Sequence, residues 1–112
     1  MKAPFILNEN GDISLFKDME SLVCYLEPED IRNCEYTVHD SDGYKLKLDI
    51  GRDSKNIQIV RVSERDDNKC CLDALKISLI EFLNSLDINT VSNAPTLDQL
   101  IIIIVQKLGY TT

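Results

Sequence analysis

The sequence lacks most of the residues that recognisable catalytic sites need. It has no tryptophan and one histidine, His39. It contains no Walker loop, no GxGxxG pattern and no nucleophile elbow. Neighbouring carboxylates such as Glu29 and Asp30 are the residue type used in acid–base catalysis, but no apolar pocket that would tune them is visible, so a solvated acidic loop is the better interpretation. We therefore expect a protein that is not an enzyme and needs no cofactor.

The cysteines are not arranged for metal binding. The four cysteines lack CxxC spacing, and a zinc site would need all four, or three of them together with the single histidine. We expect free thiols that act as small apolar side chains, with a reactive thiol as the alternative for the adjacent pair near the start of a helix. The cysteines are Cys24, Cys34, Cys70 and Cys71. No metal site is expected.

Long hydrophobic runs are absent. The longest, residues 100–105, has six residues, where a membrane-spanning helix needs about 20. The apolar run at residues 5–7 is too short for the core of a signal peptide. A chain of 112 residues fits one domain. We therefore expect a single cytoplasmic domain that does not enter a membrane.

Basic residues are nearly missing from residues 18–42. This segment holds eight acids and one base, so 8 − 1 gives a net charge of −7, equal to that of the whole chain. Clustered charge of one sign steers partners of the opposite sign, so a basic partner is favoured over nucleic acid or an anionic membrane. The alternative is RNA binding by a strip of basic residues on the solvent-exposed face of the sheet. The strip comprises Lys45, Lys47, Arg52, Lys55 and Arg61.

Two hairpins and a further strand are predicted in the first 63 residues. Asn10-Gly11 between residues 5–7 and 13–16 is a strong hairpin signal, and a short helix should begin after Asp18 and stop at Pro28. Residues 35–39 and 44–50 should form the second hairpin around an Asp-Ser-Asp-Gly turn, which lacks the first carboxylate of a calcium loop. Residues 56–63 should continue the meander, with a bulge suggested at residues 59 and 60.

The C-terminal half has helical periodicity. Leucines and a phenylalanine recur at spacings of three and four from a start near Asn68, and a capping box at residues 96–99 begins a helix that Gly109 should end. Residues 100–105 are apolar all round, so some of the isoleucines at 101–104 should contact a second surface; a strand is the alternative. The predicted fold is α+β: an antiparallel sheet of about five strands, a short helix after the first hairpin and two C-terminal helices.

Residues 4–50 resemble a family of small bacterial proteins. The resemblance rests on the run Leu-Asn-Glu-Asn-Gly-Asp-Ile at residues 7–13, on Tyr-Leu-Glu-Pro-Glu-Asp-Ile at 25–31, and on Glu-Tyr-Thr-Val-His-Asp-Ser-Asp-Gly at 35–43. These segments are similar to immunity proteins of polymorphic toxins, of the type associated with Rhs and contact-dependent growth inhibition effectors. The C-terminal helices match only in type.

The resemblance implies that the chain binds and neutralises a cognate toxin domain, one to one, without catalysis. Such toxins are often nucleases with basic clefts, and an RNase is expected before a DNase. The acids would steer the encounter, and tyrosines would supply buried anchors. The expected partner-binding residues are Tyr25, Glu27, Glu29, Asp30, Glu35, Tyr36, Asp40, Asp42 and Tyr44. The alternative is a cytoplasmic adaptor or regulatory module that self-associates through the isoleucine-rich helix, with a weak homodimer as its mildest form.

Overall fold

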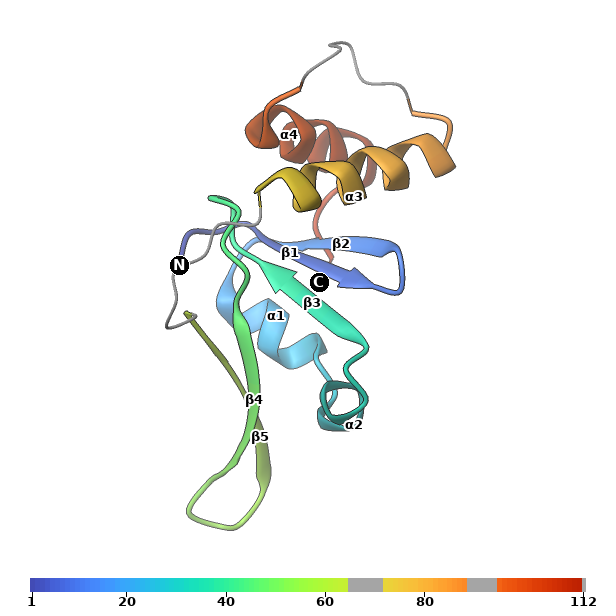
Figure 1. The fold of residues 1–112 in the computed structure, drawn as a ribbon. Coiled ribbons are helices and arrows are strands. Elements are labelled where there is room, and N and C mark those ends of the chain that lie inside the picture. Colours follow the sequence, from blue (N-terminus) through green and yellow to red (C-terminus); the bar gives the residue numbers. More distant parts are fainter. Residues whose placement is uncertain (65–71, 89–94, 112) are drawn as a thin grey trace.

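The computed structural model describes residues 1–64, 72–88 and 95–111. Its fold is α+β, as predicted, with five strands and two C-terminal helices (Figure 1). The elements are β1 (Phe5–Glu9), β2 (Asp12–Phe16), α1 (Met19–Tyr25), α2 (Pro28–Arg32), β3 (Tyr36–His39), β4 (Lys47–Arg52), β5 (Gln58–Ser63), α3 (Leu72–Ser85) and α4 (Leu97–Leu108).

The first hairpin is confirmed. β1 and β2 pair antiparallel up to Glu9 opposite Asp12, which leaves Asn10 and Gly11 as a two-residue turn. Both turn residues have positive φ, 54° and 97°, as the primed turns of tight hairpins require. The Asn8 side chain accepts a hydrogen bond from the Gly11 N–H at 2.8 Å. This turn fixes where β1 ends.

The predicted strands are present but are divided between two sheets. β3 pairs with the other side of β1, giving a three-stranded sheet in the order β2-β1-β3, while β4 pairs only with β5. After the turn of the second hairpin, the chain stays paired with β3 only as far as Leu46, whose N–H donates to the Val38 carbonyl at 2.8 Å. β4 then turns away from β3. Leu48, Val60 and Val62 thereby pack over the first sheet, a burial that a flat continuation of the meander would not allow.

The ladder between β4 and β5 contains no bulge. Pairing is continuous from Lys47 opposite Ser63 to Arg52 opposite Gln58. Val60 packs inward, and its neighbour Ile59 lies on the exposed face of the hairpin. The bulge suggested at residues 59 and 60 is therefore wrong, because the strand keeps its alternation and places an isoleucine on the solvent side.

Two short helices follow the first hairpin. The Asp18 side chain caps α1 by accepting a hydrogen bond from the Ser21 N–H at 2.8 Å, as predicted. Pro28 lies after the end of α1, where the helix was expected to stop, but it also occupies the first turn of α2, which was not predicted. Proline fits this position because its missing N–H would be unpaired there in any case.

The two C-terminal helices form a pair. The predicted start of the first, near Asn68, lies outside the described residues. In α4 the capping box is confirmed: the Gln99 N–H donates to Thr96 Oγ1 at 3.2 Å, and the Thr96 N–H donates to Gln99 Oε1 at 2.9 Å. Gly109 ends the helix with φ of 74°, also as predicted.

Most of the isoleucine-rich segment packs within the domain. Ile101 and Ile104 are buried, and Ile103 packs partly buried against the same core. Ile102 is 53 % exposed and is flanked along the helix by Asp98, Gln99 and Gln106. The segment is a helix and not a strand, and Ile102 is the one strongly exposed residue among isoleucines 101–104.

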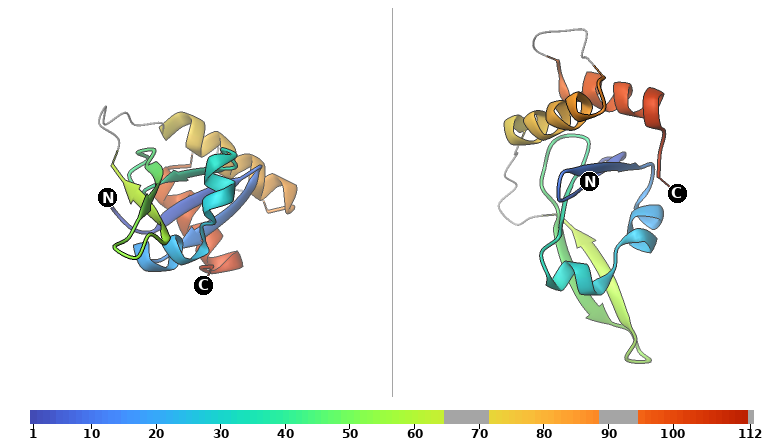
Figure 2. Two further views of the ribbon diagram at one scale, coloured as in Figure 1. Left: turned by 90° about the horizontal axis from the view of Figure 1, so that it is seen from below. Right: turned by 90° about the vertical axis from the view of Figure 1, so that its right-hand side faces the viewer.

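Strand β1 separates two hydrophobic cores. Ile6, with residues of β2, packs against α3 and α4, whereas Phe5 and Leu7 pack on the opposite face with α1 and the inner side of the β4–β5 hairpin. Figure 2 shows the sheet between the helix pair and the hairpin. In the part of the chain that the structure describes, no helix is long and apolar enough to cross a membrane.

Candidate functional site

Three carboxylates from separate segments come together where β1 ends and β3 begins. Glu9 is the last residue of β1, Asp30 lies in α2, and Glu35 directly precedes β3. Glu9 is opposite Tyr36 in the β1–β3 register, and the Tyr36 hydroxyl donates a hydrogen bond to Asp30 Oδ2 at 2.9 Å. The side chain of Glu35 lies against Asp30 and within the field of Glu9. We call Glu9, Asp30 and Glu35 the acidic cluster.

Two tyrosines border the acidic cluster. The Tyr25 hydroxyl donates to Glu9 Oε1 at 3.2 Å, and its ring packs against Phe16 with centroids 5.3 Å apart. The Tyr36 hydroxyl, besides donating to Asp30, accepts from the Glu27 N–H at 3.4 Å. Each tyrosine thus presents an apolar ring anchored in the fold and a hydroxyl that faces a carboxylate, a combination enriched at protein interfaces.

The local sequence explains why these residues meet. Pro28 starts α2, and Cys34, with φ of 57°, turns the chain out of it. The Glu35 N–H donates to the Asp30 carbonyl at 3.0 Å, so this turn places Glu35 beside Asp30. β3 then starts directly at Tyr36, opposite the end of β1. Helix, turn and strand register therefore fix all three carboxylates.

The charges of the acidic cluster repel one another. A hydrogen bond with Asp30 and the charge of Asp30, followed by desolvation and the charge of Glu9, raise the pKa of the Glu35 carboxyl. Burial, followed by a hydrogen bond to Asp30, raises the pKa of Tyr36 to about 12. Burial and the charge of Glu9 likewise raise the pKa of Tyr25. Neighbouring carboxylates lead the shift of Glu35 and add to the effect of burial on both tyrosines, so negative charge is concentrated at this end of the sheet.

Basic side chains of the described residues do not neutralise the acidic cluster. The described residues form three ion pairs, none of which includes a member of the cluster: the N-terminal ammonium with Glu64 at 2.8 Å, Lys2 with Asp42 at 3.7 Å, and Arg32 with Glu29 at 3.3 Å. Arg32 is the single base of residues 18–42, and it pairs with Glu29. The predicted residues Glu27 and Glu29 are exposed beside the cluster, so they extend the same acidic surface.

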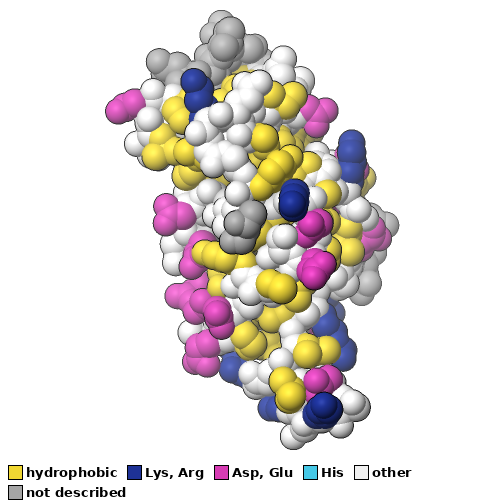
Figure 3. Space-filling model, turned by 180° about the vertical axis from the view of Figure 1, so that it is seen from behind, with side chains coloured by type: hydrophobic (Ala, Val, Ile, Leu, Met, Phe, Trp, Pro, Cys, Tyr) yellow, Lys and Arg dark blue, Asp and Glu magenta, His cyan; other side chains and the backbone are white. Residues whose placement is uncertain are grey.

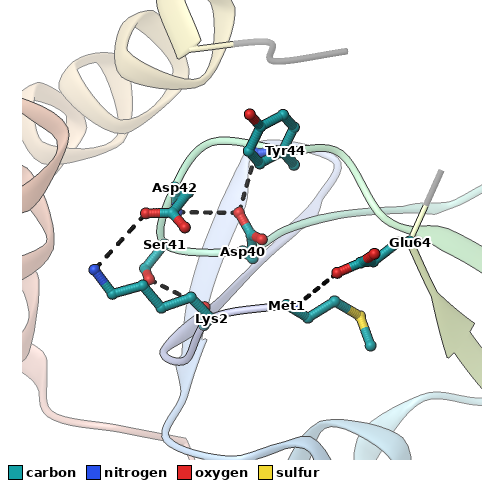
Figure 4. Close-up of polar contacts among 7 residues, drawn as sticks. All are labelled: Met1, Lys2, Asp40, Ser41, Asp42, Tyr44 and Glu64. Carbon is teal, nitrogen blue, oxygen red and sulfur yellow. Dashed lines mark hydrogen bonds and ion pairs between the residues drawn. The ribbon is translucent and has the colours of Figure 1, made fainter. Parts of the chain in front are cut away.

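The remaining predicted residues lie at the opposite end of β3. Asp40 is only 4 % exposed, and its Oδ1 accepts hydrogen bonds from the N–H groups of Asp42 and Tyr44, each at 3.0 Å (Figure 4). Its role in the loop is structural, and it does not contribute an exposed carboxylate. Asp42 and Tyr44 are exposed but lie in this loop, away from the acidic cluster. The nine predicted residues therefore form two groups.

The loop at residues 40–44 is tied to the N-terminus of the chain. The Ser41 N–H donates to the Lys2 carbonyl at 2.9 Å, and the Ser41 hydroxyl is within hydrogen-bond distance of the Lys2 and Ala3 carbonyls at 3.0 and 3.1 Å. Figure 4 shows the Lys2 ammonium reaching Asp42 and the Met1 ammonium reaching Glu64. These contacts explain the burial of Ser41 and indicate a structural loop.

Charge is separated across the molecule. Residues 44–63 hold five bases and two acids, so 5 − 2 gives +3, against −7 for residues 18–42. Figure 3 shows acidic side chains along one edge of the molecule and basic side chains gathered at its lower end, where the β4–β5 hairpin lies. The side chain of Arg61 lies across Gly51 on the hairpin, where an added Cβ would meet the guanidinium. The predicted basic strip thus belongs to this hairpin.

The described residues do not offer a metal site. They contain no group of three or more histidine, cysteine, aspartate or glutamate side chains placed to hold an ion. Cys24 and Cys34 are free and exposed, whereas Cys70 and Cys71 fall outside the described residues. His39 is buried, and its Nδ1 has no hydrogen-bond partner.

Comparisons with protein-family models, with curated proteins and with solved structures give no match to this chain. The site must therefore be interpreted from its own residues. Sequence reasoning missed Glu9, because it precedes the acid-rich segment. The Asn10-Gly11 turn was the available signal: it fixes Glu9 at the end of β1, and a third strand beside β1 would bring further acids next to it.

Proposed function

We propose that this chain is an immunity protein that binds and neutralises the toxin domain encoded with it. The toxin domain would be a nuclease with a basic cleft, with an RNase expected before a DNase. Binding would be one to one and non-catalytic, through the acidic cluster and the neighbouring Glu27 and Glu29. The observation that carries this proposal is the acidic cluster itself, whose mutual repulsion is not relieved by any of the ion pairs described above.

A basic partner would relieve that repulsion. Removing like-charge repulsion on binding adds to the attraction between partners, and the field of the cluster speeds their encounter. Exposed ion pairs are individually worth only about 0 to 1 kcal/mol, so tight binding also needs anchors. Tyr25 and Tyr36 supply them: both rings are held by the fold, and both hydroxyls lie next to carboxylates. This division of roles supports an inhibitor of a cationic protein.

The test is binding to the C-terminal domain of any large secreted protein encoded beside this chain. Calorimetry at two salt concentrations should give one-to-one binding that weakens with salt. The double variant Asp30→Asn with Glu35→Gln should weaken binding and flatten the salt dependence. The matched control, Asp73→Asn with Glu81→Gln on α3, removes the same charge elsewhere and should leave affinity close to that of the unmodified chain. Equal effects of the two double variants would contradict the acidic cluster as the contact.

A second candidate, an adaptor that self-associates through α4, rests on the exposure of Ile102. Its neighbours one turn away are the polar Asp98, Gln99 and Gln106 and the half-buried Val105, and the other isoleucines of α4 pack against the core of the domain. We therefore rank self-association second.

A further inference from the structure

A cleft opens where β4 separates from β3. It has a volume of about 290 Å³ and lies between the end of α2, β3 and the start of β4. Apolar side chains of Ile31, Val38, Leu46 and Leu48 contribute to its lining, together with Cys34 and Tyr36. The lining side chains of Val38 and Leu46 belong to the core on this face of the sheet, so the cleft gives access to the edge of that core.

The edge of β3 is unpaired at Tyr36, beside this cleft. The Val38 carbonyl accepts from Leu46, so the peptide groups of Val38 point away from β1. Peptide groups alternate along a strand, and those of Tyr36 therefore point the same way. β4 begins at Lys47 and pairs with β5, so in the described part of the chain no strand lies beside Tyr36 on that side. An unpaired edge next to an apolar cleft is the arrangement that binds an extended peptide segment.

The two ends of the cleft carry opposite charges. Asp30 and Glu35 flank its Tyr36 end. The half-buried Lys45, whose backbone forms a β-bridge with that of His39, lies at the other end. A segment with a base at one end and an acid at the other complements both. The charge pattern thus selects the occupant and sets its direction along β3.

We propose that an extended segment of the partner adds a short strand to the free edge of β3 at Tyr36. An apolar side chain of that segment fills the cleft, a basic one contacts Asp30 and Glu35, and an acidic one contacts Lys45. The inference rests on the proposed function and specifies how the same end of the molecule recognises its partner. It makes the binding site a combination of backbone pairing, one apolar anchor and two charge contacts.

The test uses the full chain and the peptide Ac-Lys-Thr-Leu-Thr-Glu-NH2 as a probe. Amide hydrogen exchange measured by NMR should slow about tenfold at Tyr36 when the peptide is present at saturation, because strand addition protects that N–H. A peptide with glycine in place of leucine should lose most of the binding. Contacts of this small area are weak, so millimolar peptide is the appropriate range.

The plug variant Cys34→Phe should abolish binding by filling the cleft. Its matched control, Cys24→Phe, alters the other exposed free cysteine and should bind as the unmodified chain does. Peptide binding without protection of Tyr36, or equal binding of the leucine and glycine peptides, would overturn the inference. If at the same time the Asp30→Asn, Glu35→Gln variant still lost the toxin domain, the proposed function would stand without the added strand.

Discussion

His39 lies in β3 with only 7 % of its surface exposed and with Nδ1 unpaired. Burial, and next the charge of Lys45, lower its pKa from 6.5 to about 4, although the charge of Asp40 acts in the opposite direction. Between these two pH values the unfolded chain binds a proton that the folded chain does not. The free energy of unfolding should therefore fall as the pH drops from 6.5 towards 4.

We expect the His39→Leu variant to lose much of this acid sensitivity. A shift of this direction and size in a largely buried group corresponds to about 1 to 3 kcal/mol once partial solvent screening is allowed for. Urea unfolding at pH 7 and at pH 4.5 would measure it: the unmodified chain should lose this amount between the two values, and the variant clearly less. An unchanged difference in the variant would assign the acid sensitivity to other groups.

Asp40 is expected to matter for folding and not for partner binding. Asp40→Ala leaves the N–H groups of Asp42 and Tyr44 without their acceptor and should cost about 1 to 3 kcal/mol of unfolding free energy. Asp40→Asn keeps an oxygen that can accept and should cost less. Thermal unfolding of both variants would measure this difference. Equal losses would show that the charge of Asp40, and not its acceptor oxygen, holds the loop.

Glu35, unlike Asp40, is expected to contribute to partner binding while lowering the stability of the free chain at neutral pH. Because its pKa is raised in the folded chain, the protonated form is favoured by folding, and the stabilisation is lost as the pH rises through the folded pKa. Glu35→Gln resembles the protonated form, so at pH 7 it should stabilise the free chain while weakening binding of the toxin domain. Chemical unfolding and calorimetry on the same variant would test both signs. A variant that destabilises the free chain would contradict the repulsion.

At the scale of the elements, α4 carries both a buried and an exposed isoleucine. Ile104 is 1 % exposed, and Ile102, two residues earlier, is 53 % exposed. Truncating a buried isoleucine leaves a cavity, whereas truncating an exposed one removes little packing. The two positions therefore offer matched substitutions on one element.

Ile104→Ala should lower the free energy of unfolding by about 2 to 5 kcal/mol, and Ile102→Ala by less than about 1 kcal/mol. Chemical unfolding would measure both. Sedimentation of the Ile102→Ala chain would also test self-association. If this substitution converted a dimer to a monomer, α4 would be an interface, and the adaptor would become the leading function.

The elements also show what the sequence can and cannot predict. Hairpin turn, helix cap and capping box are local signals, and Asn10-Gly11, Asp18 and Thr96 each predicted the observed geometry. The departure of β4 from β3 was not predictable in this way, because it follows from burial of Leu48 against a core assembled from distant residues. The acidic cluster was predicted only in part for the same reason: Asp30 and Glu35 are close in the sequence, but Glu9 reaches them through strand pairing.

On the scale of the whole molecule, the separation of charge should govern association. A basic partner is attracted by the acidic cluster but repelled by the β4–β5 hairpin, whose segment carries +3. Fields of this kind act mainly on the association rate, and salt screens them over a Debye length of about 10 Å at 0.1 M.

Arg61→Gln should accordingly speed association with the toxin domain at low salt, by about twofold, with little effect at high salt. Stopped-flow measurement at two salt concentrations would detect the change, and Lys107→Gln on α4 provides a control for the loss of one base far from the hairpin. Slower association of the Arg61→Gln chain would place the hairpin inside the interface and not outside it.

Strands β1 and β2 contribute alternate side chains to two cores: Ile6, Ile13 and Leu15 on one side of the sheet, and Phe5, Leu7 and Phe16 on the other. Repacking the core beneath α3 and α4 should therefore disturb the side chains that shape the cleft and the acidic cluster less than repacking the opposite core would. Substitutions in the two compartments should accumulate largely independently. Such an arrangement would let residues on one side of the sheet change while the core on the opposite side keeps the chain folded.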